Sequence, residues 1–486
     1  MKQFVCDFKL NSEWLRRQFE NSATFQARKV VNVQQPELPI MIFYFDCMVN
    51  GDRLNRDVVA ALCRQQLCQG EGDLAERVAN SVLYAGTRTF SDETETVAVQ
   101  IASGDCVVMV GDCPRVIILD LKGFATRSVE QPDGEISIAG PHEGFNENII
   151  NALGLIKKRL CSPKLRAEFI KLGKQSHTAV GILYMEGIVK EGVVRRVREQ
   201  VKRISIDGVW DANYVSEMLL GNTTMLFPLV GKTQRPDVAA AKLCEGRVIL
   251  LINGSPTALS VPYVFTENFQ TSDDYYTVRP YGNVGRILRM VGFFLSFLVP
   301  GIFIALVLHH PQMLPGELMY SLAAAGRGVP IGSLPEILLI TLVFEILRET
   351  GARMPSAIGL ALNVVGALVL GQAAVEAGFV SAPMVIVVAF SGTVGLMVGG
   401  LRGTVFFLRL GFIAAGALLG WFGILALGAC LWVYLHSLNS CGVPYMYTFS
   451  PFYSLAEQDV FFRAKIPFMN FRNKKFSENR KRQGRV

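Results

Sequence analysis

The hydrophobic and polar positions divide this chain into two unequal stretches. Residues 1–285 mix charged and apolar side chains as a globular region does, whereas residues 288–437 are dominated by Leu, Ile, Val, Phe, Ala and Gly. Long stretches of apolar helix are stable in lipid rather than in water. The pattern therefore predicts a soluble N-terminal half followed by a membrane-spanning half.

The soluble half contains short runs of apolar and β-branched residues that have the length of strands. These runs are residues 40–45, 107–110, 115–120, 178–184 and 247–252. Between them lie two stretches with helical spacing, residues 146–160, with Asn146 as the expected N-cap, and residues 193–204. This alternation predicts an α/β cytosolic domain over residues 1–285, in two subdomains split near residue 175.

The apolar half predicts an all-α polytopic membrane domain over residues 286–437. A helix needs roughly 20 apolar residues to cross about 30 Å of hydrocarbon. Three segments meet this requirement: residues 290–308, and residues 356–378 and 382–400, which we expect to form a hairpin.

Two further apolar segments leave the number of crossings open. Residues 335–348 are short and charged, so a re-entrant or surface helix explains them as well as a span does. Residues 404–435 would form a helix roughly 48 Å long at about 1.5 Å per residue. Such a helix must tilt strongly, turn back, or lie partly in the interface, where Arg402 and Arg409 suit an amphipathic lead-in.

The basic residues indicate the orientation of the chain. Arg286 and Arg289 precede the first span, and the region 438–486 is strongly basic. Its positive residues are Arg463, Lys465, Arg472, Lys474, Lys475, Arg480, Lys481, Arg482 and Arg485. Positive residues beside spans favour the cytoplasmic side, where they contact anionic lipid rather than nucleic acid. Both termini are therefore expected in the cytosol, with four or six crossings.

Candidate chemistry is sparse in this sequence. The N-terminus lacks the apolar core of a secretory signal, and the ten cysteines form no CxxC pair or zinc pattern, which indicates reduced thiols. No nucleotide-binding, metalloprotease or serine-hydrolase motif is present, and the five histidines never approach ligand spacing. We expect no enzyme activity, no catalytic residue, no metal site and no cofactor.

Polar residues inside the apolar half carry the functional signal, because they are costly in lipid and usually face a bundle interior or a water path. Asn363, Gln372 and Glu376 lie within or at the end of the segment 356–378. Glu345 and Arg348 can pair locally at positions i and i+3, or lie at a subunit contact that transmits a signal. We favour the local pair.

Several separated blocks of residues resemble one known family. In the soluble half they are residues 140–148 (GPHEGFNEN), 206–208 (IDG), 234–237 (QRPD), 245–248 (EGRV) and 274–276 (DYY). In the membrane half they are residues 310–315 (HPQMLP), 344–349 (FEILRE), 366–378 and 442–445 (GVPY). In order and spacing these blocks are similar to the A subunits of bacterial spore germination receptors, the GerA type.

The resemblance implies a subunit of the inner spore membrane that works with a transporter-like B subunit and a lipoprotein C subunit. It also implies a ring of A subunits, a pentamer in this interpretation, that conducts monovalent cations when nutrient arrives. We expect the segment 356–378 to line the axis, with a candidate pathway at Leu362, Asn363, Leu370 and Glu376. Candidate structural or coupling residues are Glu345, Arg348, Gln372 and Arg409.

Three alternatives stay open at this point. The chain can be a non-conducting scaffold or signal-transducing subunit of the same complex, or a related stage V sporulation paralogue. A stand-alone secondary transporter fits less well, because such proteins usually show ten or more spans or internally repeated halves.

Overall fold

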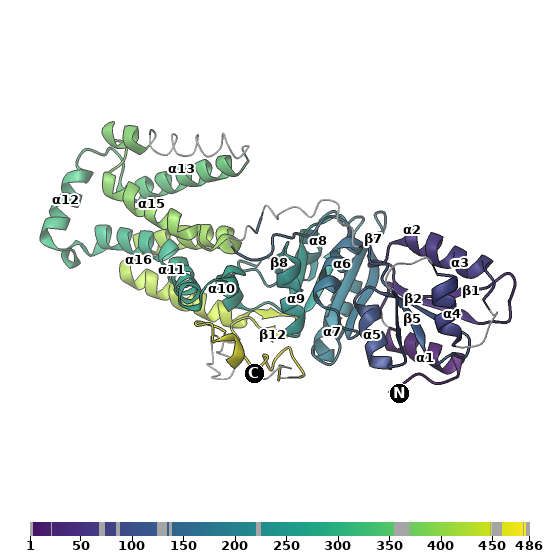
Figure 1. Cartoon of the computed structure of the whole chain (residues 1–486). Helices are drawn as coiled ribbons and strands as arrows, with labels where there is room; N and C mark the ends of the chain where they lie inside the picture. Colours follow the sequence, from purple (N-terminus) through teal and green to yellow (C-terminus); the bar gives the residue numbers. More distant parts are fainter. Residues whose placement is uncertain are drawn as a thin grey trace.

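The computed structural model describes residues 3–20, 22–67, 73–83, 88–123, 134–135, 139–219, 225–353, 369, 371–447, 449, 459–479 and 481–482. Two five-stranded antiparallel sheets come first along the chain, and a group of long helices follows them (Figure 1). The C-terminal segment returns to the region where the sheets and the helices meet. The α/β character of the N-terminal half and the helical character of the other half are confirmed.

The first sheet has the order β1-β2-β4-β5-β3. Its strands are β1 (Phe25–Val30), β2 (Ile40–Phe45), β3 (Arg88–Ser91), β4 (Cys106–Val110) and β5 (Val116–Leu119). Helices α1 (Phe8–Gln18) and α5 (Thr94–Ala102) supply buried residues to the core on one face. The other face is covered by the π-helical stretch Leu54–Val59, which continues the short helix α2 (Gly51–Arg53), and by α3 (Ala60–Arg64) and α4 (Leu74–Ser81). Both faces are apolar because helices cover both, which explains the continuous hydrophobic runs.

The second sheet repeats this arrangement with the order β6-β7-β9-β10-β8. Its strands are β6 (Leu165–Leu172), β7 (Thr178–Met185), β8 (Gly231–Thr233), β9 (Val248–Ile252) and β10 (Ala258–Val261). Helices α6 (Ile149–Arg159) and α9 (Pro236–Cys244) pack on one face, and α7 (Glu191–Arg203) and α8 (Ala212–Leu219) pack on the other.

Two boundary predictions for this half are wrong. Residue 175 lies inside the β6–β7 hairpin, whose strands pair from Leu165↔Met185 to Leu172↔Thr178, so the change from one sheet to the other comes before α6. The N-cap of α6 is Asn148 rather than Asn146, because the Asn148 side chain accepts hydrogen bonds from the backbone N–H groups of Ile150 and Asn151.

A buried lysine joins the two sheet units. Lys157 of α6 is 3% exposed and donates a hydrogen bond to Thr24 Oγ1 at 3.1 Å. Its ammonium lies 3.1 Å from the ring centroid of Phe45 in β2. Burial lowers the pKa of Lys157 to about 8, because desolvation disfavours the charged form. The contact between the units therefore includes a group whose charge depends on pH.

The described part of the membrane half contains α11 (Arg279–His309), α12 (Gly316–Gly326), α13 (Ser333–Arg353), α15 (Ala382–Gly395) and α16 (Arg402–Ser437). A short helix, α10 (Asp273–Tyr276), precedes them. Among the described residues, two helical segments are long and apolar enough to cross a membrane, Arg279–His309 and Gly399–Ser437. The segment 335–348 belongs to a helix of 21 residues, longer than expected, whereas the helix expected over 382–400 ends at Gly395.

The apolar segment 404–435 turns back on itself. Gly420 has φ 59° and ψ −138°, which interrupts α16. Thr404 donates a hydrogen bond to the carbonyl oxygen of Leu226 at 2.5 Å, and the Leu226 N–H donates to the hydroxyl oxygen of Tyr434 at 3.1 Å. A straight helix would separate positions 404 and 434 by roughly 45 Å. We expected this segment to tilt strongly, to turn back, or to lie partly in the interface, and the structure shows that it turns back.

The C-terminal segment packs on the soluble half instead of leaving it. Ser440 of β11 (Asn439–Ser440) donates a hydrogen bond to the carbonyl oxygen of Leu229 at 2.6 Å. Phe476 is buried in a cluster with Val264, and Ser477 donates to the carbonyl oxygen of Ile188 at 3.1 Å. The chain thus enters and leaves the helical region at the end that faces the soluble half (Figure 1).

Candidate functional site

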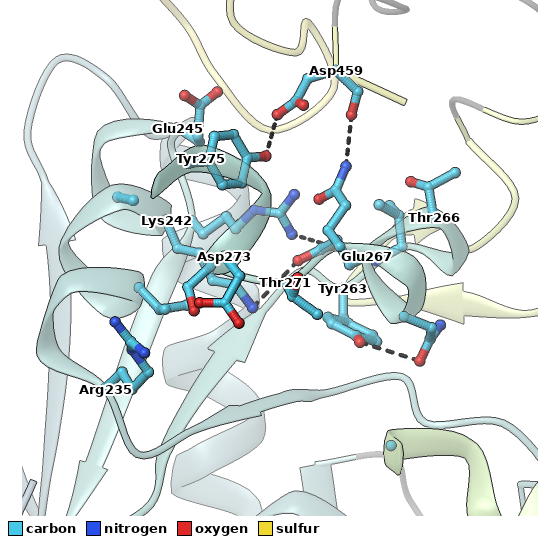
Figure 2. Close-up of a pocket in the computed structure, with 18 of the residues that line it drawn as sticks. Arg235, Lys242, Glu245, Tyr263, Thr266, Glu267, Thr271, Asp273, Tyr275 and Asp459 are labelled. Carbon is cyan, nitrogen blue, oxygen red and sulfur yellow. Dashed lines mark hydrogen bonds and ion pairs between the residues drawn. The ribbon is translucent and has the colours of Figure 1, made fainter. Parts of the chain in front are cut away.

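A cavity of about 760 Å³ lies where the soluble half meets the start of the membrane half (Figure 2). Its walls come from α9 (Lys242), α10 (Tyr275), the C-terminal segment (Asp459) and the turn between α15 and α16 (Met397). These segments are far apart in sequence, so tertiary structure alone brings them together. The cavity therefore lies at the junction of the soluble half, the first helices of the membrane half and the C-terminal segment.

The carboxylate of Glu267 contacts several polar groups in the part of the cavity wall nearest the second sheet. Glu267 pairs with Arg247 and lies 3.4 Å from Lys242 Nζ, and it also accepts a hydrogen bond from the Val264 N–H at 2.9 Å. The Lys242 ammonium donates to Ser260 Oγ at 2.9 Å. Burial lowers the pKa of Lys242 below its ordinary value, although Glu267 opposes this shift.

The QRPD block forms a second buried cluster at the cavity. Asp237 accepts two hydrogen bonds from Arg235, at 3.1 and 2.8 Å, and one from the Tyr276 hydroxyl at 2.6 Å. Arg235 also donates to the carbonyl oxygen of Pro141 at 3.0 Å. Burial alone would raise the pKa of Asp237, but these donors hold it below its ordinary value. Three blocks of the sequence resemblance therefore meet here.

A third network ties the soluble half to the first membrane helix. Asp274 of α10 is 3% exposed and accepts hydrogen bonds from Arg289 at 2.5 and 2.6 Å and from Arg286 at 3.3 Å. Arg286 also bonds to Asp459 Oδ1 at 2.8 Å, and Tyr275 donates to the same carboxylate. Burial and the Asp459 charge raise the pKa of Tyr275, so this phenol stays a donor.

Arg409 lies inside the helix bundle, and the interfacial lead-in expected around it is wrong. Its side chain is 1% exposed and donates to the carbonyl oxygens of Ser296 in α11 and Ser391 in α15, both at 3.0 Å. Glu336 of α13, also buried, accepts hydrogen bonds from the Ser381 N–H and hydroxyl at 2.6 and 2.7 Å. These contacts pair Glu336 and two of the three guanidinium nitrogens of Arg409 inside the bundle, whereas Arg409 Nη1 is buried without a hydrogen-bond partner among the described residues.

The remaining candidate residues of the membrane half fall into two groups. Arg348 and Glu345 form an ion pair within α13, and both are half-buried. Gln372 donates a hydrogen bond to Glu376 Oε1 at 2.9 Å, and both side chains are exposed. Three candidate pathway residues lie outside the described residues, namely Leu362, Asn363 and Leu370.

Sequence reasoning missed most of the junction. Arg286 and Arg289 were interpreted as charges beside a span, whereas both bind Asp274. Asp274 stands in the DYY block, so the family resemblance contained a signal for it. Asp459 carries no local signal, because its partner Arg286 is 173 positions away. Pairing between distant charges follows from tertiary contacts that composition does not reveal.

The described groups suit binding and coupling. Within the part of the chain that the structure describes, no three His, Cys, Asp or Glu side chains gather closely enough to hold a metal ion. The nine cysteines of the described ranges are free thiols. The cavity walls combine paired cations and carboxylates with three tyrosines and with apolar side chains such as Met397 and Phe476.

The chain is similar to proteins of one family over nearly its whole length. The model of the family described as Bacillus/Clostridium GerA spore germination protein matches residues 13–475. Spore germination protein KA of Bacillus subtilis is 29% identical, over 92% of this chain and 82% of the relative. Spore germination protein XA of Bacillus anthracis is 32% identical, over 85% and 84%.

One solved structure is also similar to this chain. The crystal structure of the N-terminal domain of the A subunit of the Bacillus megaterium spore germinant receptor GerK3 covers 54% of this chain and 97% of its own, with 24% identity and a TM-score of 0.43. The family match and the relatives decide the assignment. This chain belongs to the GerA family of spore germination proteins, the A subunits of germinant receptors.

Proposed function

We propose that this chain is the membrane subunit of a nutrient-responsive germination receptor, and that several copies surround a cation pathway. Family membership supports the first part of the proposal. The second part is inferred from polar groups in the membrane half, most directly from Glu376. In this proposal the chain lies in the inner spore membrane, works with a transporter-like B subunit and a lipoprotein C subunit, and has no catalytic role.

The exposed pair of Gln372 and Glu376 carries the proposal. A charged side chain facing lipid costs about 3 kcal/mol, so a carboxylate in a membrane half is expected to face another subunit or water. Helix α15 begins at Ala382 and leads to Met397, which lines the cavity beside the soluble half. Glu376 therefore lies toward the opposite end of the bundle, where a ring of carboxylates would attract cations at a pore mouth.

The hydrophobic candidates complete this proposed pathway. Leu362 or Leu370 would form a constriction that closes by dewetting, and Asn363 would offer an amide oxygen to a cation. A ring needs one helix per copy at its axis, and the segment 356–378 combines these residues with glycines that permit close approach.

The proposed orientation has two supports. The C-terminal segment packs on the soluble half, so both ends of the membrane half lie on one side. Arg279, Arg286, Arg289 and Arg402 all lie near that side, and basic residues favour the cytosol. Because α16 turns back at Gly420, each of its two arms is counted as one crossing. Both ends of the membrane half lie on the same side, so the total number of crossings is even, and we propose six crossings.

Cation flux from the purified chain in liposomes tests the proposal. We expect potassium efflux down an imposed gradient, and we expect Glu376→Gln to reduce cation-over-anion selectivity about threefold to tenfold because it removes the charge at the mouth. Glu191→Gln, an exposed carboxylate of α7 in the soluble half, is the matched control and should leave selectivity unchanged.

The same experiment separates the alternatives. The chain is first tested alone and then together with its B and C subunits and nutrient. Absence of flux in both preparations would refute the channel and would support a scaffold or signal-transducing subunit. Flux that Glu376→Gln leaves fully selective would place the pathway elsewhere in the membrane half.

A further inference from the structure

The turn that follows β2 in the first sheet unit and the turn that follows β7 in the second are alike. The two strands hold the same place in their sheets. The Val49 N–H donates to the carbonyl oxygen of Phe45 at 3.2 Å, and the Val189 N–H donates to that of Met185 at 3.1 Å. A helix begins two residues after each valine, α2 in the first unit and α7 in the second. The two turns can therefore be compared residue by residue, with Val49 equivalent to Val189.

In the first unit this turn pairs with the chain that continues from β5. The Asn50 N–H donates to the carbonyl oxygen of Leu121 at 2.9 Å. The Gly123 N–H donates to the carbonyl oxygen of Met48 at 3.0 Å. These two bonds form an antiparallel bridge centred on Val49. The first unit thus supplies the partner of this turn from residues that directly follow one of its own strands.

In the second unit the C-terminal segment makes the equivalent bonds. The Lys190 N–H donates to the carbonyl oxygen of Phe476 at 3.0 Å. The Glu478 N–H donates to the carbonyl oxygen of Ile188 at 2.8 Å. These bonds form an antiparallel bridge centred on Val189, with donors and acceptors in the same positions as in the first unit. The C-terminal segment therefore takes the place that the continuation of β5 holds in the first unit.

The chain that follows β10 is engaged elsewhere. The Tyr263 N–H donates to Ser440 Oγ at 2.9 Å, and the Phe265 N–H donates to the carbonyl oxygen of Tyr445 at 2.9 Å. These residues thus pair with the chain that follows α16. Backbone groups at the edge of a folded unit need hydrogen-bond partners. The turn after β7 consequently receives its partner from a segment that comes after the whole membrane half.

The segment that binds here forms a compact loop, residues 470–479, 481 and 482, which we name the clasp. Its two ends are joined, because the Arg482 N–H donates to the carbonyl oxygen of Asn470 at 3.0 Å. Across the loop, Arg472 Nη1 donates to the carbonyl oxygen of Lys481 at 2.9 Å. A segment that holds its bound shape by its own contacts loses less conformational entropy on binding. The clasp is therefore preorganised for this position.

A buried aromatic ring anchors the clasp. Phe476 is 2% exposed and packs in an apolar cluster with Val264. The centroid of its ring lies 4.6 Å from the guanidinium of Arg247. The next residue, Ser477, is 1% exposed and donates to the carbonyl oxygen of Ile188 at 3.1 Å. A ring in a pocket beside a row of backbone hydrogen bonds is the arrangement by which proteins bind extended peptides.

Two arginines attach the clasp to the turn between α9 and β9. Arg472 Nε donates to the carbonyl oxygen of Cys244 at 2.6 Å, and Arg482 pairs with Glu245. The clasp therefore bridges two turns of the second unit, the one after β7 and the one after α9.

We propose that these two turns form a peptide-binding site of the second sheet unit, and that the clasp is its ligand, bound within the same chain. The C-terminal segment is also bonded to α11 through Asp459 and Arg463, so an occupied site ties the second unit to the first membrane helix. Phe471, Arg472 and Phe476 line the junction cavity, so release of the clasp opens that cavity on one side. The proposal is independent of cation conduction.

Cutting the full chain ahead of the clasp tests the proposal. A protease recognition sequence is inserted after Pro467, in an exposed stretch, and the folded chain in detergent is then cleaved. We expect the C-terminal fragment to stay with the chain on size-exclusion chromatography. We expect an excess of a synthetic peptide of residues 470–486 to replace it.

Variants of the peptide test the anchor while the chain itself stays unchanged. The Phe476→Ala peptide should compete at least about thirtyfold more weakly, because it lacks the buried ring. The Lys474→Ala peptide is the matched control, changed at an exposed position of the clasp, and should compete like the native peptide.

Each other outcome overturns the proposal. A fragment that separates on cleavage and does not rebind would show that the turns form no binding site. Equal competition by the Phe476→Ala peptide would refute the anchor. A fragment that the peptide never replaces, or aggregation of the cleaved chain, would show that the clasp is a fixed part of the core and not a ligand.

A disulfide identifies which chain supplies the clasp. Val189 and Ser477 lie opposite each other as a pair without mutual hydrogen bonds, and the Cα atoms of such pairs are about 4.5 Å apart, within reach of a disulfide. In an otherwise cysteine-free chain, Val189→Cys and Ser477→Cys should crosslink within one chain. A dimer-sized product would show that a second copy supplies the clasp and would refute binding within the chain.

Discussion

Replacing Gly420 with alanine adds one methyl group, but we expect it to lower the stability of the folded membrane half by several kcal/mol. Gly420 makes the turn between the two arms of α16 with φ 59° and ψ −138°. Residues with a Cβ rarely adopt this conformation, and holding one there costs about 1–3 kcal/mol. The substitution therefore acts on the backbone first.

Steric overlap adds to this backbone strain. An alanine Cβ at position 420 would lie 2.9 Å from His310 Nε2 and 3.1 Å from His309 Cβ, so the His310 ring would have to rotate and His309 would have to shift by a few tenths of an ångström. Overpacking of this kind costs about 1–3 kcal/mol. The total of about 2–6 kcal/mol is a large part of the 5–15 kcal/mol that typically stabilises a folded protein.

Thermal unfolding of the full chain in detergent measures the effect. Gly428→Ala is the matched control, because position 428 lies in the second arm of the same helix with nothing within 4 Å of an added Cβ. We expect a clear drop in melting temperature for Gly420→Ala and no drop for the control. Equal melting temperatures would show that the chain does not turn at Gly420 in the membrane.

A labelling experiment then tests the turn itself. In a cysteine-free chain, Ser437→Cys at the end of α16 should resist a membrane-impermeant thiol reagent added outside intact cells. A straight helix would place this position on the outer side and allow labelling.

Three further predictions concern other parts of the molecule. Between pH 8 and the ordinary lysine pKa of 10.5, Lys157 binds fewer protons in the folded state than in the unfolded chain. The free energy of unfolding should therefore rise with pH across this range, by up to about 3 kcal/mol. Denaturant unfolding measures this rise, and Lys157→Met should abolish it. Asp274→Asn should destabilise the junction by about 3–5 kcal/mol and expose the C-terminal segment to limited proteolysis, whereas Asp273→Asn should have a small effect. Gly301→Leu should prevent α11 from packing on α16, because even a Cβ would lie 2.9 Å from the Phe412 carbonyl oxygen, and folded protein should be lost on size-exclusion chromatography.

Local patterns in the sequence predicted five of the ten strands in the two sheets and missed β1, β3, β6, β8 and β10. All five runs expected as strands are strands, because apolar and β-branched residues over that length fit a covered sheet. The turn within residues 404–435 was one of three solutions that followed from length alone. The N-cap of α6 lies two residues after the predicted one. Asn146 and Asn148 are equally suitable as N-cap residues, and only the backbone conformation decides that Asn148 caps the helix.

The sequence by itself determined the α/β class of the N-terminal half, the helical and apolar character of the other half, and the family, because each depends on composition or on the order of local blocks. Tertiary structure decided the junction: Asp274 with Arg286 and Asp459, and the burial of Arg409 between Ser296 and Ser391. A charge selects its partner by distance in space, and these partners are 12 to 173 positions apart. Contacts in space also explain why the basic C-terminal region is a folded segment packed on the soluble half rather than a tail, although Lys465 is exposed.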